Sequence, residues 1–464
     1  TCPRDALVIK EPNHLSLESE VVAQVEAPRR RLLRVLGFGF GLAVIIGNTI
    51  GAGILRAPGE IAERLPGVWL FLGVWVVGGL YALLGAIQLA ELGTSIPRSG
   101  GQYVFARRAL GDYAGFVVGW SDWLSTCGTT AAVSIVIGEY LGVLFPALAG
   151  RTVMIASAVT LTFALLQWRG VVWGSRVQNL TSLLKAVAFI ALVLACFSFG
   201  GREGGDVVQE EARSPSGLAL LGALVLALQS VIYTYDGWNG VIYFSEEVRE
   251  PARNIPRSLF GGVLSIIGIY LLVNLALVYV LPVSQIAGDN LALGEAAEKI
   301  FGARGDIIIR SITIIAMLSS INAYHLMASR VLFSMSRDGL FSVRAVRVNR
   351  GGTPTAALFL STVVALLFIV GGERFETVIA ALAFFFVANY TMSFISVFVL
   401  RAREPELERP YRAWGYPWTT ALALLCSVAF LAGAVASDTG TSLYALLLLA
   451  LSYPAFILLR RLSG

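Results

Sequence analysis

Long apolar segments recur along the whole chain, and they constrain its fold more than any other feature. A helix needs about 20 apolar residues to cross the hydrocarbon core of a bilayer, and lipid tolerates only helices or closed barrels. The segments are too long for barrel strands, so the sequence predicts an all-α polytopic membrane protein with 12 transmembrane helices. The twelve segments are 36–61, 68–95, 103–143, 152–168, 175–199, 217–245, 257–281, 305–336, 354–371, 374–400, 418–437 and 440–459.

Composition supports this interpretation and excludes the soluble classes. Of 464 residues, 56% are hydrophobic and 14% are charged, and the mean hydropathy is +0.74. Soluble domains have about 45–50% apolar and about 25% charged residues, so a soluble chain of this kind would leave large apolar surfaces in water. The net charge of +5 indicates no nucleic-acid partner, because in a membrane protein the location of the cations matters more than their total.

The positions of the cations predict the orientation of the chain. We assign 22 of the 35 Lys and Arg residues to inner segments and 7 to outer ones, which is the bias of the positive-inside rule. The first 34 residues are polar and end in a cluster of four arginines, and no cleavable signal peptide is expected. We therefore expect a multi-pass protein of the cell (inner) membrane with both termini in the cytoplasm.

Two of the apolar segments are interrupted by glycines that stand beside polar residues. The first reads IGNTIGAG at 46–53, and the sixth reads YTYDGWNG at 233–240. A helix broken at membrane depth is tolerated only where protein buries it or where it lines a cavity. Paired breaks in corresponding halves are typical of inverted-repeat transporters. The alternative, that the glycines serve helix packing alone, would leave Asn48, Asp236 and Asn239 without backbone partners.

Lys185 is the only lysine inside a predicted span, in a chain with 32 Arg and 3 Lys. It follows Arg176 by nine residues, which is about 14 Å along a helix and near the middle of a core about 30 Å thick. An ionisable side chain at that depth is a functional candidate by default. The alternative is a side chain that snorkels to the inner interface.

Several segments together resemble the amino acid–polyamine–organocation superfamily, and more closely its L-type amino-acid transporter branch. The likeness runs from about residue 35 to 460. It implies a LeuT-type fold, in which spans 1–5 and 6–10 form a 5+5 inverted repeat with broken helices 1 and 6. The similar segments are IIGNTIGAGIL, YTYDGWNGVIYFSEEVREPARNIPRSL, AELGTSIPRSGGQYVFARRALGDYAGFVVGW (90–120), SRVLFSMSRDGLF (329–341) and LRAREPELERPY (400–411).

The resemblance implies a transporter and not an enzyme. It implies sodium-independent transport of neutral L-amino acids by alternating access, either by exchange or linked to protons. The domains would be a polar tail (1–34), a transport core (35–400), and an inner loop with the last two spans (401–464). A substrate carboxylate would meet the N–H groups of Ala52 and Gly53, and the amine would meet carbonyls in both breaks. The implied substrate-binding residues are Thr49, Ile50, Gly51, Ala52, Gly53, Tyr233, Thr234, Asp236 and Phe386.

The resemblance also implies a gating and coupling set. The Lys185 amino group would take the place of a sodium ion, bonded to the carbonyl of Gly47 and to a serine of the eighth span, Ser319 or Ser320. A compact ammonium can stand between carbonyls, whereas a guanidinium fork is too broad. Tyr233 would be an aromatic lid over the substrate.

Other interpretations stay open at this point. Asp236 could cap a helix end or could face a cationic substrate, which would favour cationic amino acids or polyamines. Asp122, Glu91 and Glu139 are expected near helix ends or in polar packing. His325 is expected as an interior histidine, and the alternative is a role in proton coupling, since histidine titrates near neutrality. A membrane-embedded enzyme or a channel fits the pattern less well. No metal-binding spacing or nucleotide loop is found, so we expect no cofactor. The stretch 144–151 has no cysteine, so no disulfide-linked heavy chain is implied.

Overall fold

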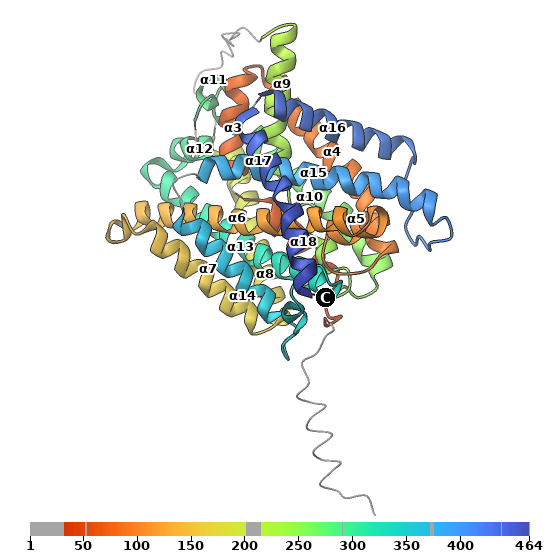
Figure 1. Ribbon diagram of the computed structural model, residues 1–464. Helices are drawn as coiled ribbons and strands as arrows, with labels where there is room; N and C mark the ends of the chain where they lie inside the picture. The colour runs from red at the N-terminus through yellow and green to blue at the C-terminus, as the bar shows by residue number, and fades with distance from the viewer. Residues whose placement is uncertain are drawn as a thin grey trace, which may run out of the picture.

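The computed structural model shows a bundle of helices (Figure 1). The structure describes residues 32–51, 53–200, 215–289, 291–371, 375–437 and 439–463. Within them, extended backbone pairs only at two isolated bridges, Leu36 with Val248 and Val348 with Pro354, so the all-α prediction is confirmed. The longer helices are α2 (Phe38–Thr49), α3 (Gly53–Arg64), α4 (Val68–Ser95), α5 (Gln102–Leu110), α6 (Asp112–Leu144), α7 (Thr152–Trp168), α8 (Val171–Phe199), α9 (Leu218–Tyr235), α10 (Pro251–Val280), α12 (Ala292–Phe301), α13 (Gly305–Arg337), α14 (Thr355–Val370), α15 (Phe375–Arg403), α16 (Trp418–Ser437), α17 (Thr439–Ala450) and α18 (Ser452–Ser463).

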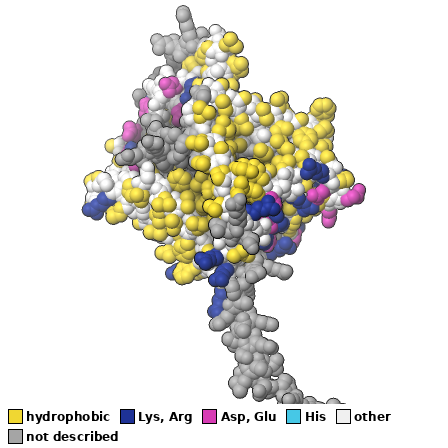
Figure 2. Space-filling view, viewed as in Figure 1, with side chains coloured by type: hydrophobic (Ala, Val, Ile, Leu, Met, Phe, Trp, Pro, Cys, Tyr) yellow, Lys and Arg dark blue, Asp and Glu magenta, His cyan; other side chains and the backbone are white. Residues whose placement is uncertain are grey.

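Many of these helices can cross a membrane. Over the described residues, eight are long and apolar enough, and the bent pair α2–α3 makes nine if it counts as one span. Three apolar helices are shorter, at Thr152–Trp168, Thr355–Val370 and Ala445–Arg460. Figure 2 shows a face covered largely by hydrophobic side chains, with charged groups gathered toward its margins. Such a surface suits lipid and would be unfavourable in water, so the chain is a multi-pass membrane protein.

Three segments differ from the predicted spans. The segment predicted at 103–143 is two helices, because Gly111 between α5 and α6 has a φ of +96°, where only glycine fits without strain. The last segment, predicted at 440–459, is divided between α17 and α18. Two short helices, α11 (Val283–Ile286) and α12, lie between α10 and α13, where the sequence predicted only an outer loop.

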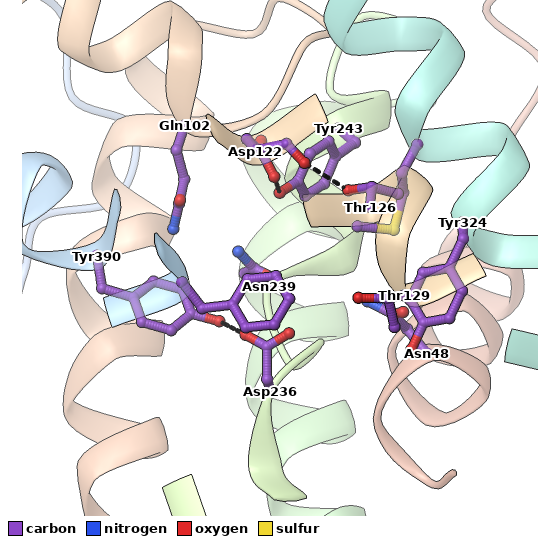
Figure 3. Close-up of a pocket in the computed structure, with 12 residues that line it drawn as sticks. Asn48, Gln102, Asp122, Thr126, Thr129, Asp236, Asn239, Tyr243, Tyr324 and Tyr390 are labelled. Carbon is purple, nitrogen blue, oxygen red and sulfur yellow. Dashed lines mark hydrogen bonds between the residues drawn. The ribbon is translucent and has the colours of Figure 1, made fainter. Parts of the chain in front are cut away.

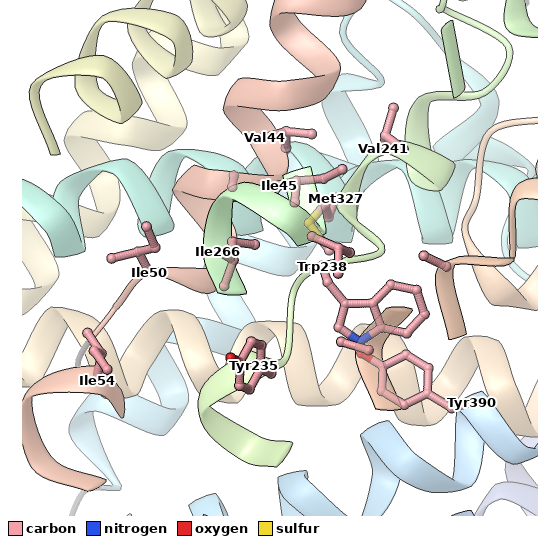
Figure 4. Packing of buried hydrophobic residues seen from close by; sticks show 14 of the residues in the cluster. Val44, Ile45, Ile50, Ile54, Tyr235, Trp238, Val241, Ile266, Met327 and Tyr390 are labelled. Atoms are coloured by element: carbon pink, nitrogen blue, oxygen red, sulfur yellow. The ribbon is translucent and has the colours of Figure 1, made fainter. Parts of the chain in front are cut away.

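Small residues allow the helices that surround the breaks to approach closely. A Cβ on Gly85 of α4 would lie 2.5 Å from the Trp238 ring, and one on Gly78 would lie 2.3 Å from Val231. Figure 4 shows the apolar side chains that pack around the breaks, among them Ile50 and Trp238. In lipid this packing stabilises helix association in place of the hydrophobic effect.

Ion pairs join the segments that carry the family resemblance. The Arg330 guanidinium and the Glu247 carboxylate are fully buried, with Nε and Oε1 3.0 Å apart. Glu91 lies against Arg401 and Arg409, at 2.5 and 3.4 Å, so its expected place in polar packing is confirmed. Two further pairs are Arg337 with Glu246 and Arg98 with Asp338.

Candidate functional site

The first interrupted helix breaks between Thr49 and Gly53. Its two halves, α2 and α3, are bent by 45°. A Cβ on Gly47 would lie 1.9 Å from the Gln178 amide nitrogen, whereas one on Gly51 would meet only the Ser320 hydroxyl, at 3.7 Å. Glycine at 47 is therefore required by packing, and the backbone at 51 has room on one side. Ala52 lies outside the described residues.

The second interruption follows Tyr235, where α9 ends, and the chain continues into the 3-10 helix η2 (Gly240–Phe244). Gly237 has a φ of +101°, which favours glycine. The Asn48 side-chain amide donates to the Gly237 carbonyl at 3.3 Å, and a Cβ on Gly237 would lie 2.7 Å from that amide. The two predicted breaks therefore meet in the folded chain.

Lys185 on α8 reaches the first break. Its amino group donates to the carbonyls of Gly47 at 2.8 Å and Ile50 at 2.5 Å, and lies 3.3 Å from the Ser320 hydroxyl. The side chain is fully buried, so it does not snorkel to an interface. Ser319 instead contacts Ser182, at 3.1 Å. The expected contact with Gly47 is present, and Ser320 is the serine that takes part.

Tyr270 of α10 links the two interrupted helices, a role that the sequence did not indicate. Its hydroxyl lies 2.8 Å from the Thr49 carbonyl and 2.9 Å from the Thr234 carbonyl. The hydroxyl has one proton, which these two acceptors share. Gly53 also approaches α9, because a Cβ there would lie 3.0 Å from the Thr234 hydroxyl. The C-terminal ends of α2 and α9 therefore both contact the buried Tyr270 hydroxyl.

A cavity opens beside the two breaks (Figure 3). About 340 Å³ between its lining residues is free of protein atoms, a volume that includes open solvent. Of the predicted substrate-binding residues, Asp236 and Phe386 line it. The others that the structure describes, Thr49, Ile50, Gly51, Gly53, Tyr233 and Thr234, are not among its lining residues. The lining residues are Asn48, Gln102, Asp122, Thr126, Thr129, Asp236, Asn239, Tyr243, Tyr324, Met327, Phe386 and Tyr390.

Asp236 combines the two features that the sequence left as alternatives. It follows the last residue of α9, and its backbone N–H donates to the Tyr233 carbonyl at 3.1 Å, which caps the helix end. Its carboxylate lines the cavity and accepts a hydrogen bond from the Tyr390 hydroxyl of α15. Among the described residues, no Lys or Arg forms an ion pair with it.

Several lining residues were missed by sequence reasoning, and Asp122 is the most unexpected. It lies inside α6, 2% exposed, so of the two expected placements, near a helix end or in polar packing, only the second fits. The missed signal is a polar stripe, because Ser125, Thr126 and Thr129 lie three, four and seven residues after Asp122, on one face of a helix. The aromatic lining residues Tyr243, Tyr324 and Tyr390 carried no comparable sequence signal.

Comparison with known proteins places the chain in a family. The amino acid permease family matches residues 38–453 of the chain. The chain belongs to that family. Within the amino acid–polyamine–organocation superfamily, this permease resembles the L-type branch, and such proteins are transporters and not enzymes.

The relatives of this permease include bacterial and animal proteins. The serine/threonine exchanger SteT of Bacillus subtilis is 27% identical over 88% of this chain and 92% of its own. The Asc-type amino acid transporter 1 of Mus musculus is 30% identical, over 83% and 73% of the two chains. The large neutral amino acids transporter small subunit 2 of Mus musculus is 28% identical, over 82% and 73%.

Proposed function

We propose that this permease carries neutral L-amino acids across the cell membrane by alternating access, without sodium, as an exchanger or linked to protons. The observation that carries the proposal is a polar cavity beside two interrupted helices that meet each other. The names of the relatives support it, since they describe a serine/threonine exchanger and transporters of amino acids.

The ends of the broken helices suit a zwitterion. The N-terminus of α3 would offer the N–H groups of Ala52 and Gly53 to the substrate carboxylate, because free donors and the helix dipole favour an anion there. The amine would meet the carbonyls of Thr49, Tyr233 and Asp236. Two of these, at Thr49 and Tyr233, already accept a hydrogen bond, but a carbonyl oxygen has two lone pairs. The rest of the proposed contact set is Ile50, Gly51, Thr234 and Phe386.

Lys185 would take the place of a coupling sodium ion. Its amino group ties α8 to the first break through Gly47 and Ile50, with Ser320 bonded to the same Gly47 carbonyl at 2.9 Å. Ser319 would support this arrangement from the neighbouring position. Tyr233, partly buried near the end of α9, would act as the lid.

The proposed architecture is LeuT-type, with 12 crossings. Over the described residues, the eight long helices, the bent pair and the three shorter apolar helices together supply that number. A 5+5 inverted repeat would occupy 35–400, followed by the last two spans in 401–464. The tail 1–34 and the C-terminus would lie in the cytoplasm, and no disulfide-linked heavy chain is implied, since 144–151 has no cysteine.

Uptake into proteoliposomes tests the proposal. Labelled alanine should enter faster when the vesicles contain amino acid or when a proton gradient is applied, and replacing sodium by choline should change nothing. The unpaired Asp236 carboxylate favours a second candidate, the transport of cationic amino acids or polyamines. Competition by arginine and putrescine, with none by alanine or leucine, would decide for that candidate.

A further inference from the structure

The walls of the cavity are polar on nearly every side. Ten of its twelve lining residues carry polar side chains, and the two apolar ones are Met327 and Phe386. A large aliphatic side chain in this space would leave buried polar groups without partners, which is costly. The cavity therefore suits a substrate whose own side chain forms hydrogen bonds.

Two acidic side chains and no basic one line the cavity. The two carboxylates are those of Asp122 and Asp236. The Tyr243 and Tyr390 hydroxyls already donate to these carboxylates. Two lining groups are buried without a hydrogen-bond partner, the Asn48 side-chain oxygen and the Gln102 side-chain nitrogen. A ligand that pairs with the carboxylates needs donors of its own, since no cation on these walls does so.

The two carboxylates approach the cavity from different helices. Figure 3 shows Asp122 of α6 and Asp236 at the end of α9 on opposite sides of it. If Asp236 meets the amine end of the substrate, as proposed above, Asp122 faces the part of the substrate that lies farther away.

Asp122 also keeps the capacity for another hydrogen bond. Its two carboxylate oxygens lie 2.8 and 3.0 Å from one donor, the Tyr243 hydroxyl, whereas an ionised carboxylate can accept about four hydrogen bonds. Thr126 and Thr129 donate their own protons to backbone carbonyls of α6, those of Asp122 and Ser125, so they do not occupy the carboxylate.

We propose that Asp122 is a specificity-determining residue that accepts a hydrogen bond from the side chain of a small amino-acid substrate. The inference rests on the proposed function, because it assigns the substrate class of that same site. The donor on the substrate is a hydroxyl, as in serine and threonine, or a short side-chain ammonium. A site built around such an acceptor discriminates against the isosteric substrate that lacks the donor.

Threonine and valine are nearly isosteric, so their competition against labelled alanine exchange tests the proposal directly. In the wild type, the inhibition constant of valine should exceed that of threonine by roughly tenfold or more, as expected when a bond to a charged group is lost. Serine and 2,3-diaminopropionate are alanine with an added hydroxyl or ammonium. The inhibition constant of alanine is therefore compared with that of each analogue, and the larger ratio identifies the preferred donor.

The variant Asp122→Asn should reduce the valine-to-threonine ratio at least fivefold. The control is Glu139→Gln, an exposed acid on the same helix, and it should keep the wild-type ratio. A ratio near one in the wild type overturns the proposal, and this measurement decides even if Asp122→Asn fails to insert. A wild-type ratio that Asp122→Asn leaves unchanged overturns it as well. If no amino acid competes at all, the proposed function itself has failed.

Discussion

Replacing Lys185 by methionine keeps most of the side-chain stem and removes the three donors of the amino group. The stem would still pack between α8 and the neighbouring helices α2 and α13, where the residue is fully buried. The carbonyls of Gly47 and Ile50 would each lose a donor now 2.8 and 2.5 Å away. The substitution therefore tests the link between α8 and the first break with little change in volume.

The expected loss follows from the number of bonds. A hydrogen bond to a charged group contributes about 1.5–3 kcal/mol, so the two shorter bonds of Lys185 together contribute about 3–6 kcal/mol. Even the lower value lowers the population of the linked arrangement by roughly 150-fold. If transport requires this arrangement, the exchange rate should fall by about two orders of magnitude.

The assay is amino-acid exchange in proteoliposomes, normalised to the amount of inserted protein. Lys299→Met is the matched control, because the Lys299 amino group bonds to Gln285 in an exposed position and away from the breaks. The control should exchange at the wild-type rate, and replacing sodium by choline should not slow the wild type. Wild-type exchange by Lys185→Met, or a strong sodium requirement, would refute the reasoning.

Three further perturbations follow from the same contacts. Tyr233→Ala should slow exchange more than it weakens equilibrium binding, because lid closure often limits turnover, while Tyr233→Phe should have a mild effect. If the alanine variant exchanges as fast as the wild type, the assignment of Tyr233 as a lid is wrong. Gly53→Val should abolish substrate binding in detergent, since a Cβ there would already lie 3.0 Å from the Thr234 hydroxyl; intact binding would contradict this. Arg330→Met leaves the Glu247 carboxylate buried and unpaired, at a cost of about 3–5 kcal/mol, so thermal unfolding should occur at lower temperature, and adding Glu247→Leu should recover much of the loss. An equally stable single variant would show that the pair contributes little.

The broken helices could be predicted because their signal is local. Glycine beside a polar residue is unusual within an apolar segment, and the breaks after Thr49 and Tyr235 lie where that pattern occurs. Lys185 stood out for a similar reason, as a lone lysine at membrane depth. Its contact with the Gly47 carbonyl came from the family resemblance, while its role in coupling stays a prediction.

The lining of the cavity could not be predicted in the same way. The polar stripe that contains Asp122 marks one face of α6, but whether that face meets a cavity or a neighbouring helix depends on how α6 packs. Tyr270 is a further example, because its hydroxyl joins carbonyls of residues 49 and 234, which are far apart in the sequence. The division at Gly111 was missed because apolar residues continue on both sides of it.

The buried acids fall into two groups that differ in their partners. Glu91 and Glu247, which lie in segments that resemble the family, each meet an arginine from another such segment. Asp122 and Asp236, which line the cavity, have only tyrosine hydroxyls as side-chain partners among the described residues. Removing one partner of a pair in the first group would leave a buried charge uncompensated, which is costly. Under the proposed function, a donor or cation that arrives with the substrate would supply the missing partner of the second group.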